Sequence, residues 1–280
     1  MSRVAVVLPI LALLAVLAAG GLLWVSSSER EPLPAVASGA PEATPTPIPE
    51  AARPRLEPGQ TVCQGRLHVP EKGAPRTLPA LYTHVEEELG IAVVGSENIP
   101  QEAFDEARRT IARTFANNDL EGGLAEQGAY VIIVDRDKGV LDLPEFACLE
   151  GRYNPNFFDH VCGIADRADY PVATVNVDDL LGERAGPCSG LNILFHELGH
   201  LIQTWSLSPA DFFDIKQFYF EALSAGKYKR QYAATSANEY FAEATQSYFL
   251  SGDPNGARDR AWLEEYDPQL HALLETIYGK

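Results

Sequence analysis

A short apolar stretch with two histidines constrains this chain more than any other feature. Residues 191–202 read LNILFHELGHLI, in which His196 and His200 lie four positions apart in the pattern HExxH. On an α-helix, this spacing projects both rings from one face about one turn apart, so both can bind one metal ion. The apolar residues around them form the opposite stripe and predict a buried helix whose histidine face borders a cleft. Glu197 can reach the open coordination position as a general base.

The motif requires a third ligand, because a catalytic zinc ion usually binds three protein side chains and a water molecule. The metzincin pattern, with a further histidine six positions on, is absent, since that position holds Ser206. Residues 236–249, SANEYFAEATQSYF, predict a second helix on which Glu239 and Glu243 lie four positions apart. Two alternatives remain. Ser236 and Glu239 fit a local capping box, and Glu243 fits a solvated helix face.

The pair of motifs resembles a known group of enzymes. HELGH followed by NEYFAE resembles the gluzincin metallopeptidases, and YAATSANEYFAEATQSYF is similar to the catalytic domain of the anthrax lethal factor family. The resemblance covers residues 188–280. It implies that His196, His200 and Glu239 bind one Zn²⁺ per chain and that Glu197 is the catalytic base.

The same resemblance suggests roles for two further side chains. Tyr232, seven positions before Glu239, matches a tyrosine of the family and could donate a hydrogen bond or a proton during catalysis. Its alternative is a packed aromatic residue with an exposed hydroxyl. Glu243 matches the second acidic position, where a carboxylate can accept the free N–H of a ligand histidine and fix its tautomer.

The hydrophobic pattern predicts an α+β fold of the zincin-like metallopeptidase type. A mixed sheet region precedes a mostly helical C-terminal half that contains the active-site helix. Strands are expected at residues 61–69, 91–95, 129–135 and 171–177, and helices at 78–89, 101–116, 189–204, 209–225, 236–250 and 268–277. Residues 143–171 show no clear period.

The N-terminal 60 residues differ in composition from the rest of the chain. Residues 4–25 carry no charge, follow Arg3 and are long enough to span an apolar bilayer core of roughly 30 Å. Residues 26–59 are rich in Pro, Ala and Glu, which predicts an extended stalk. We expect a signal-anchor over residues 1–28, a disordered stalk over 29–60 and a metallopeptidase domain over 61–280, divided into a mixed α/β part (61–187) and a helical part (188–280).

The predicted location follows from the anchor. Arg3 before the apolar segment and the acidic stalk after it place the peptidase domain on the extracytoplasmic side of the cell membrane. The alternative is secretion after cleavage of a signal peptide. The four cysteines, which show no CxxC spacing, then form two disulfides. Three pairings are open, and the local one joins Cys148 with Cys162 and leaves Cys63 with Cys188.

Charge and motifs together narrow the function. A net charge of −17 argues against nucleic acid as a partner, because phosphate backbones require a basic surface. The predicted partner is a peptide or protein substrate, and the oligomeric state is not indicated. The predicted function is a zinc-dependent endopeptidase acting on an extracytoplasmic protein or peptide. Its alternatives are a membrane-tethered zinc-containing binding protein without hydrolytic activity and a zinc hydrolase of a non-peptide bond.

Overall fold

The computed structural model describes residues 78–147, 161–165, 171–183, 192–250 and 258–279. The expected anchor, stalk and first strand (residues 61–69) lie outside these ranges. Within the described ranges, no helix is long and apolar enough to cross a membrane.

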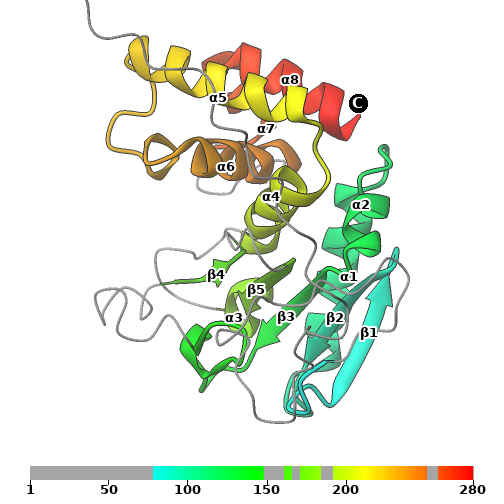
Figure 1. The fold of residues 1–280 in the computed structure, drawn as a ribbon. Helices are drawn as coiled ribbons and strands as arrows, with labels where there is room; N and C mark the ends of the chain where they lie inside the picture. The colour runs from blue at the N-terminus through cyan, green and yellow to red at the C-terminus, as the bar shows by residue number, and fades with distance from the viewer. Residues whose placement is uncertain (1–77, 148–160, 166–170, 184–191, 251–257, 280) are drawn as a thin grey trace, which may run out of the picture. The chain divides into compact units, whose positions relative to one another are not determined.

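A five-stranded mixed sheet forms the N-terminal half of the described fold (Figure 1). Its strands, in spatial order, are β1 (His84–Glu88), β2 (Ile91–Gly95), β3 (Tyr130–Val134), β5 (Val172–Asn176) and β4 (Gly163–Ile164). The three central strands β2, β3 and β5 run parallel, and the edge strands β1 and β4 pair antiparallel with their neighbours. The short strand β4 was not expected, because two residues are too few to show a period.

The predicted helix over residues 78–89 is wrong, since this segment contains the edge strand β1. Leu89 and Gly90 both have positive φ angles, 54° and 77°, and join β1 to β2 in a tight hairpin. Such a turn suits the right-handed twist of paired strands. Pairing with the apolar strand β2 thus overrides the helix preference of the three glutamates in HVEEE.

Both faces of the sheet are covered, so its central strands are apolar along their whole length. One face packs on α1 (Gln101–Thr114), α3 (Val177–Leu180) and α4 (Ile193–Trp205). The other face packs on Tyr82, which precedes β1, and on Val140, Leu143 and Phe146, in and around the short helix η3 (Val140–Asp142). The expected strands at 91–95, 129–135 and 171–177 and the helix at 101–116 are confirmed.

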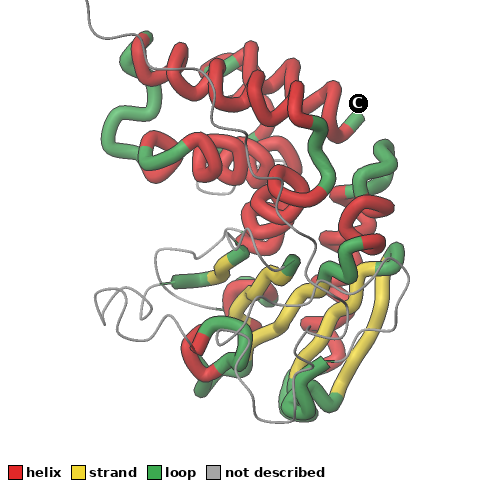
Figure 2. Tube along the Cα trace, viewed as in Figure 1, coloured by secondary structure: helices red, strands yellow, loops and turns green. Residues whose placement is uncertain are grey.

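The C-terminal half is helical (Figure 2). After α4 come α5 (Pro209–Ser224), η6 (Tyr232–Ala234), α6 (Ala237–Phe249), α7 (Arg260–Tyr266) and α8 (Pro268–Tyr278), and the short α2 (Glu121–Glu126) lies earlier in the chain. Ser208 and Ser236 cap α5 and α6 through their side chains. Four of these helices match the expected ranges within a few residues, while α2 and α7 were not expected. The predicted α+β fold with a mixed sheet and a helical C-terminal half is confirmed.

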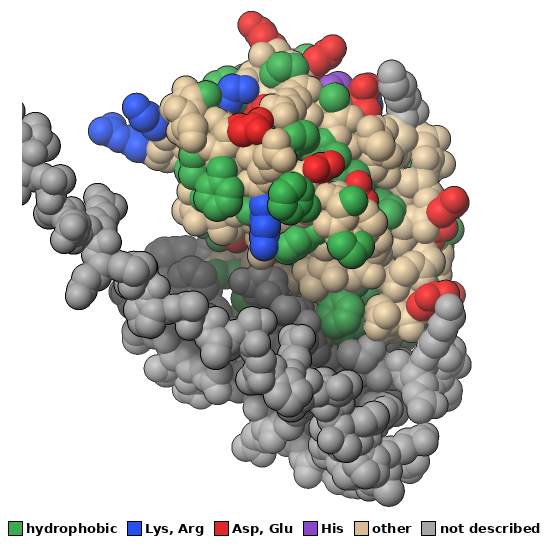
Figure 3. Space-filling view, turned by 45° about the horizontal axis from the view of Figure 1, so that its top comes forward, with side chains coloured by type: hydrophobic (Ala, Val, Ile, Leu, Met, Phe, Trp, Pro, Cys, Tyr) green, Lys and Arg blue, Asp and Glu red, His purple; other side chains and the backbone are tan. Residues whose placement is uncertain are grey.

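Helix α5 has one buried and one exposed side. Ile215, Tyr219 and Ala222 are buried, whereas Phe213 and Phe220 are exposed. Figure 3 shows apolar side chains interspersed with acidic and basic ones over the described part of the face that it presents. Helix α5 therefore packs on the core through the side that carries Ile215, Tyr219 and Ala222.

One described cysteine bears on the predicted disulfides. Cys162, next to β4, is buried and disulfide-bonded. Cys63, Cys148 and Cys188 lie outside the described residues. Disulfide formation is thus confirmed for Cys162, and the choice of partner stays a prediction.

Candidate metal centre

Helix α4 presents the HExxH motif in the interior of the molecule. The helix begins after Asn192, whose side chain accepts a hydrogen bond from the backbone N–H of Leu194 at 3.2 Å. It packs against the sheet on one side and against α6 on the other. Because residues 193–203 are all buried, His196, Glu197 and His200 are polar groups inside an apolar helix environment. Buried polar side chains of this kind need hydrogen-bond partners or a bound ion, so the groups around them indicate their role.

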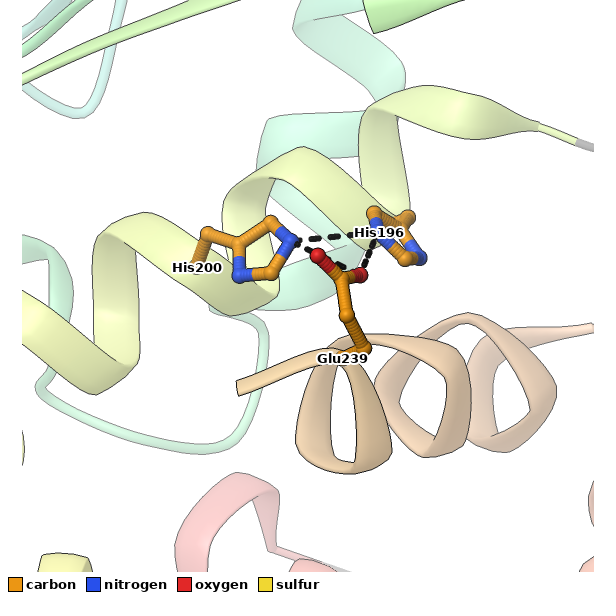
Figure 4. Close-up of side chains that lie close together, drawn as sticks. All are labelled: His196, His200 and Glu239. Atoms are coloured by element: carbon orange, nitrogen blue, oxygen red, sulfur yellow. Dashed lines mark hydrogen bonds and ion pairs between the residues drawn. The ribbon is translucent and has the colours of Figure 1, made fainter. Parts of the chain in front are cut away.

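Helix α6 supplies the third side chain. Ser236 caps the helix by accepting a hydrogen bond from the backbone N–H of Glu239 at 3.1 Å. The capping interaction expected from the sequence is therefore present, but it uses the backbone of Glu239. The carboxylate of Glu239 points toward the two histidines instead (Figure 4). The local capping role and a ligand role are thus compatible in one residue.

The three side chains converge on one point. The Nε2 atoms of His196 and His200 are 3.1 Å apart, and Oε2 of Glu239 lies 3.1 Å from the first and 3.4 Å from the second. Zinc bonds of about 2.0–2.1 Å in a tetrahedral arrangement put ligand atoms about 3.3–3.4 Å from one another. The observed separations of 3.1–3.4 Å lie within about 0.3 Å of this value, so the group could hold a metal ion.

The charge state of Glu239 suits a ligand. Burial alone would raise the pKa of its carboxyl, but hydrogen bonds and charge interactions with His196 and His200 outweigh burial and lower this pKa to about 2. The carboxylate is therefore ionised at neutral pH, as metal coordination requires.

Two further predicted side chains border the same group. The hydroxyl of Tyr232 donates a hydrogen bond to Oε1 of Glu239 at 3.2 Å, and its ring centroid lies 6.3 Å from that of His196. Tyr232 is 54% exposed, so its hydroxyl stands between the ligand group and solvent. Oε1 of Glu243 lies 3.7 Å from Nδ1 of His196, an ion-pair separation just beyond hydrogen-bond range. The structure thus places both side chains beside the ligand group, and the roles expected for them from the sequence stay predictions.

The side chain of Glu197 extends from α4 toward the edge strand β4. A Cβ atom added to Gly163 would approach Oε1 of Glu197 to 2.7 Å and its Cγ atom to 2.9 Å. Only glycine leaves room for this approach. Glu197 is also 4% exposed, so its carboxylate is enclosed by protein. The sequence showed no sign of β4, and the glycine is recognisable only from this contact.

A cavity of about 390 Å³ lies away from the metal group, at the C-terminal ends of β3 and β5. Its lining includes Arg136, Asn176 and Asp178, and neither histidine of α4 contributes to it. Thr174, which also lines it, points to the sheet face opposite α4, because its neighbours Ala173 and Val175 belong to the core on the α4 side. Among the described residues, the candidate metal ligands and the candidate base thus lie apart from this cavity.

Comparison with known proteins supports the fold. No family profile and no curated protein match this sequence. Among solved structures, the chain is similar to the Pro-Pro endopeptidase PPEP-2 from Paenibacillus alvei, with a TM-score of 0.50 and 19% sequence identity. The match covers 66% of this chain and 97% of the other. At this identity the likeness shows a shared fold, that of an endopeptidase. The resemblance to the anthrax lethal factor family stays an expectation from the motifs.

Proposed function

We propose that this chain is a zinc-dependent endopeptidase. The observation that supports it most strongly is the convergence of His196, His200 and Glu239 at 3.1–3.4 Å, on a fold similar to that of an endopeptidase. Two imidazoles and one carboxylate form a ligand set known from catalytic zinc sites, which leave the fourth position for water. The gluzincin type of the motif is part of this proposal.

The chemistry follows from the placement of the side chains. Bound zinc would polarise the scissile carbonyl and lower the pKa of a water molecule toward about 7. Glu197 accepts a proton from the water molecule as the water oxygen bonds to the carbonyl carbon. Glu197 then delivers that proton to the leaving amine when the C–N bond breaks. The hydroxyl of Tyr232, which donates to Oε1 of Glu239 in the structure, would turn its single O–H to the carbonyl oxygen as negative charge develops there.

The name of the structural neighbour suggests the first substrates to test. Peptides with a Pro-Pro bond, and matched peptides in which one proline is alanine, would show whether this chain shares that preference. The two alternatives from the sequence are a non-hydrolytic zinc-binding protein and a hydrolase of another bond. An enclosed Glu197 beside the ligand histidines favours hydrolysis over binding alone.

We also propose that the domain acts outside the cytoplasm, held by the N-terminal segment. The apolar residues 4–25 and the disulfide at Cys162 support this location, because disulfides persist in oxidising compartments. Protease treatment of intact cells should remove the domain. Its survival until lysis would contradict the proposed orientation.

Substitution separates metal binding from hydrolysis. Replacing His196, His200 or Glu239 with alanine should each reduce bound zinc, as measured by elemental analysis, because three protein ligands are the usual catalytic minimum. Glu197→Gln should retain about one zinc per chain while peptide cleavage falls by orders of magnitude. His84→Ala is the matched control, since His84 lies on β1 and pairs with Glu86. Cleavage by Glu197→Gln at the parental rate would refute the assigned mechanism.

A further inference from the structure

We propose that Arg258 is a positioning residue of the metal centre, which holds Glu243 against His196. This inference rests on the proposed function, because it assigns His196 to the metal. Nothing in the sequence motifs points to Arg258, which lies outside both of them. The contacts on α6 and at the start of α7 carry the inference.

Glu243 connects two partners with its two oxygens. Oε1 lies 3.7 Å from Nδ1 of His196, and Oε2 lies 3.3 Å from a guanidinium nitrogen of Arg258. The side chain of Glu243 is 24% exposed, so water competes for both oxygens. A carboxylate in such a place can rotate away from the histidine unless its second oxygen is held. Arg258 provides that hold, and the order of contacts is Arg258, Glu243, His196.

Arg258 is itself fixed by the start of α7. The side chain of Asp259 caps this helix by accepting a hydrogen bond from the backbone N–H of Trp262 at 2.9 Å. The guanidinium of Arg258 lies 5.7 Å from the ring centroid of Trp262, within range of a cation–π contact. The Trp262 ring in turn stacks on Tyr266 at 4.7 Å. The contact with the packed Trp262 ring therefore restricts the Arg258 side chain before it meets Glu243. This restriction reduces the conformational entropy lost when the ion pair forms.

The charges near the metal group favour a cation at this position. Glu197, Glu239 and Glu243 bring three carboxylates to the region of α4 and α6 where both histidines lie. A divalent ion would balance two of these charges, and Arg258 balances the third. Side chains that orient a ligand histidine typically change metal affinity by about 10- to 100-fold when removed. Arg258 acts one contact further out and is 39% exposed, so its effect should be smaller.

The experiment measures zinc affinity of the full chain by competition with a chromophoric chelator. Glu243→Ala should weaken zinc binding by about 10- to 100-fold, and Arg258→Ala by roughly three- to tenfold. In the Glu243→Ala background, Arg258→Ala should change the affinity by less than about 1.5-fold, because its effect passes through Glu243.

Arg260→Ala is the matched control for charge and location. Arg260 lies two positions after Arg258, and its replacement by alanine removes the same charge. Its guanidinium contacts the hydroxyl of Tyr248 at 2.8 Å and Glu275 at 3.4 Å, and not Glu243. Its substitution should leave zinc affinity unchanged. Thermal unfolding of the metal-free variants reports whether the fold itself is changed. Arg258→Ala should weaken zinc binding while the unfolding midpoint of the metal-free protein stays close to that of the parent.

Three results would overturn the inference. The first is parental zinc affinity in Arg258→Ala, the second an equal loss in Arg260→Ala, and the third an unchanged effect of Arg258→Ala without Glu243. Failure of the proposed function looks different, because Glu239→Ala would then bind zinc as tightly as the parent.

Discussion

Gly199, between the two histidines of HELGH, determines how closely α4 approaches α6. A Cβ atom at this position would lie 3.1 Å from the backbone Cα of Ala242 and 3.1 Å from Cβ and Oγ1 of Thr245, both on α6. Carbon atoms at their ordinary contact distance are about 3.5–4.0 Å apart. Gly199→Ala should therefore push α6 outward by at least about 0.4 Å. Glu239 lies on α6, so its carboxylate moves away from the histidines of α4.

The expected result is a loss of zinc affinity out of proportion to the loss of stability. Metal sites keep their ligand distances within about 0.2 Å, which is less than the expected displacement, so zinc affinity should fall at least about tenfold. Alanine favours the helix by about 1 kcal/mol over glycine, whereas overpacking costs about 1–3 kcal/mol. The metal-free variant should thus lose only about 0–2 kcal/mol in free energy of unfolding, measured by urea denaturation.

Gly122→Ala is the control for this change. Gly122 lies in α2, and an added Cβ there has no atom within 4 Å among those described. The control should keep parental zinc affinity and unfold at the same or slightly higher urea concentration. Zinc binding by Gly199→Ala within twofold of the parent would refute the argument that this glycine sets the spacing of the ligands.

Three other changes test the remaining roles. Tyr232→Phe should lower kcat by about a hundredfold with little change in KM or bound zinc, if the hydroxyl acts in the transition state, and steady-state kinetics with elemental analysis measures this. In Gly163→Ala the added Cβ would lie 2.5 Å from the backbone oxygen of Thr174 and 2.7 Å from Oε1 of Glu197, so the change should displace β4 or this carboxylate and lower kcat/KM, while the zinc content stays near the parental value. Removing metal with a chelator should lower the thermal midpoint, because zinc in a hundredfold excess over its Kd stabilises the folded state by about 2.7 kcal/mol. An unchanged midpoint after complete removal would contradict binding to the folded state.

Much of the fold was predictable because the spacing of apolar residues within a single helix or strand is a local property of the sequence. The apolar runs of β2, β3 and β5 and the stripe of α1 are visible in the sequence, and the core contains them as expected. The prediction of a helix over residues 78–89 was wrong because a run of glutamates by itself favours a helix, while pairing with β2 favours a strand. That pairing is a tertiary interaction, and the period of the segment does not contain it.

The sequence by itself determined which side chains are able to bind a metal. Four-residue spacing on a helix places His196 and His200 on one face wherever that helix lies, and Glu239 lies in the first turn of a second predicted helix. Only the tertiary structure decided that the carboxylate of Glu239 meets both imidazoles, since this depends on the close crossing of α4 and α6 at Gly199. The approach of Gly163 to Glu197 and of Arg258 to Glu243 was decided in the same way, because distances between segments far apart in the chain are set by packing of the core and not by local spacing.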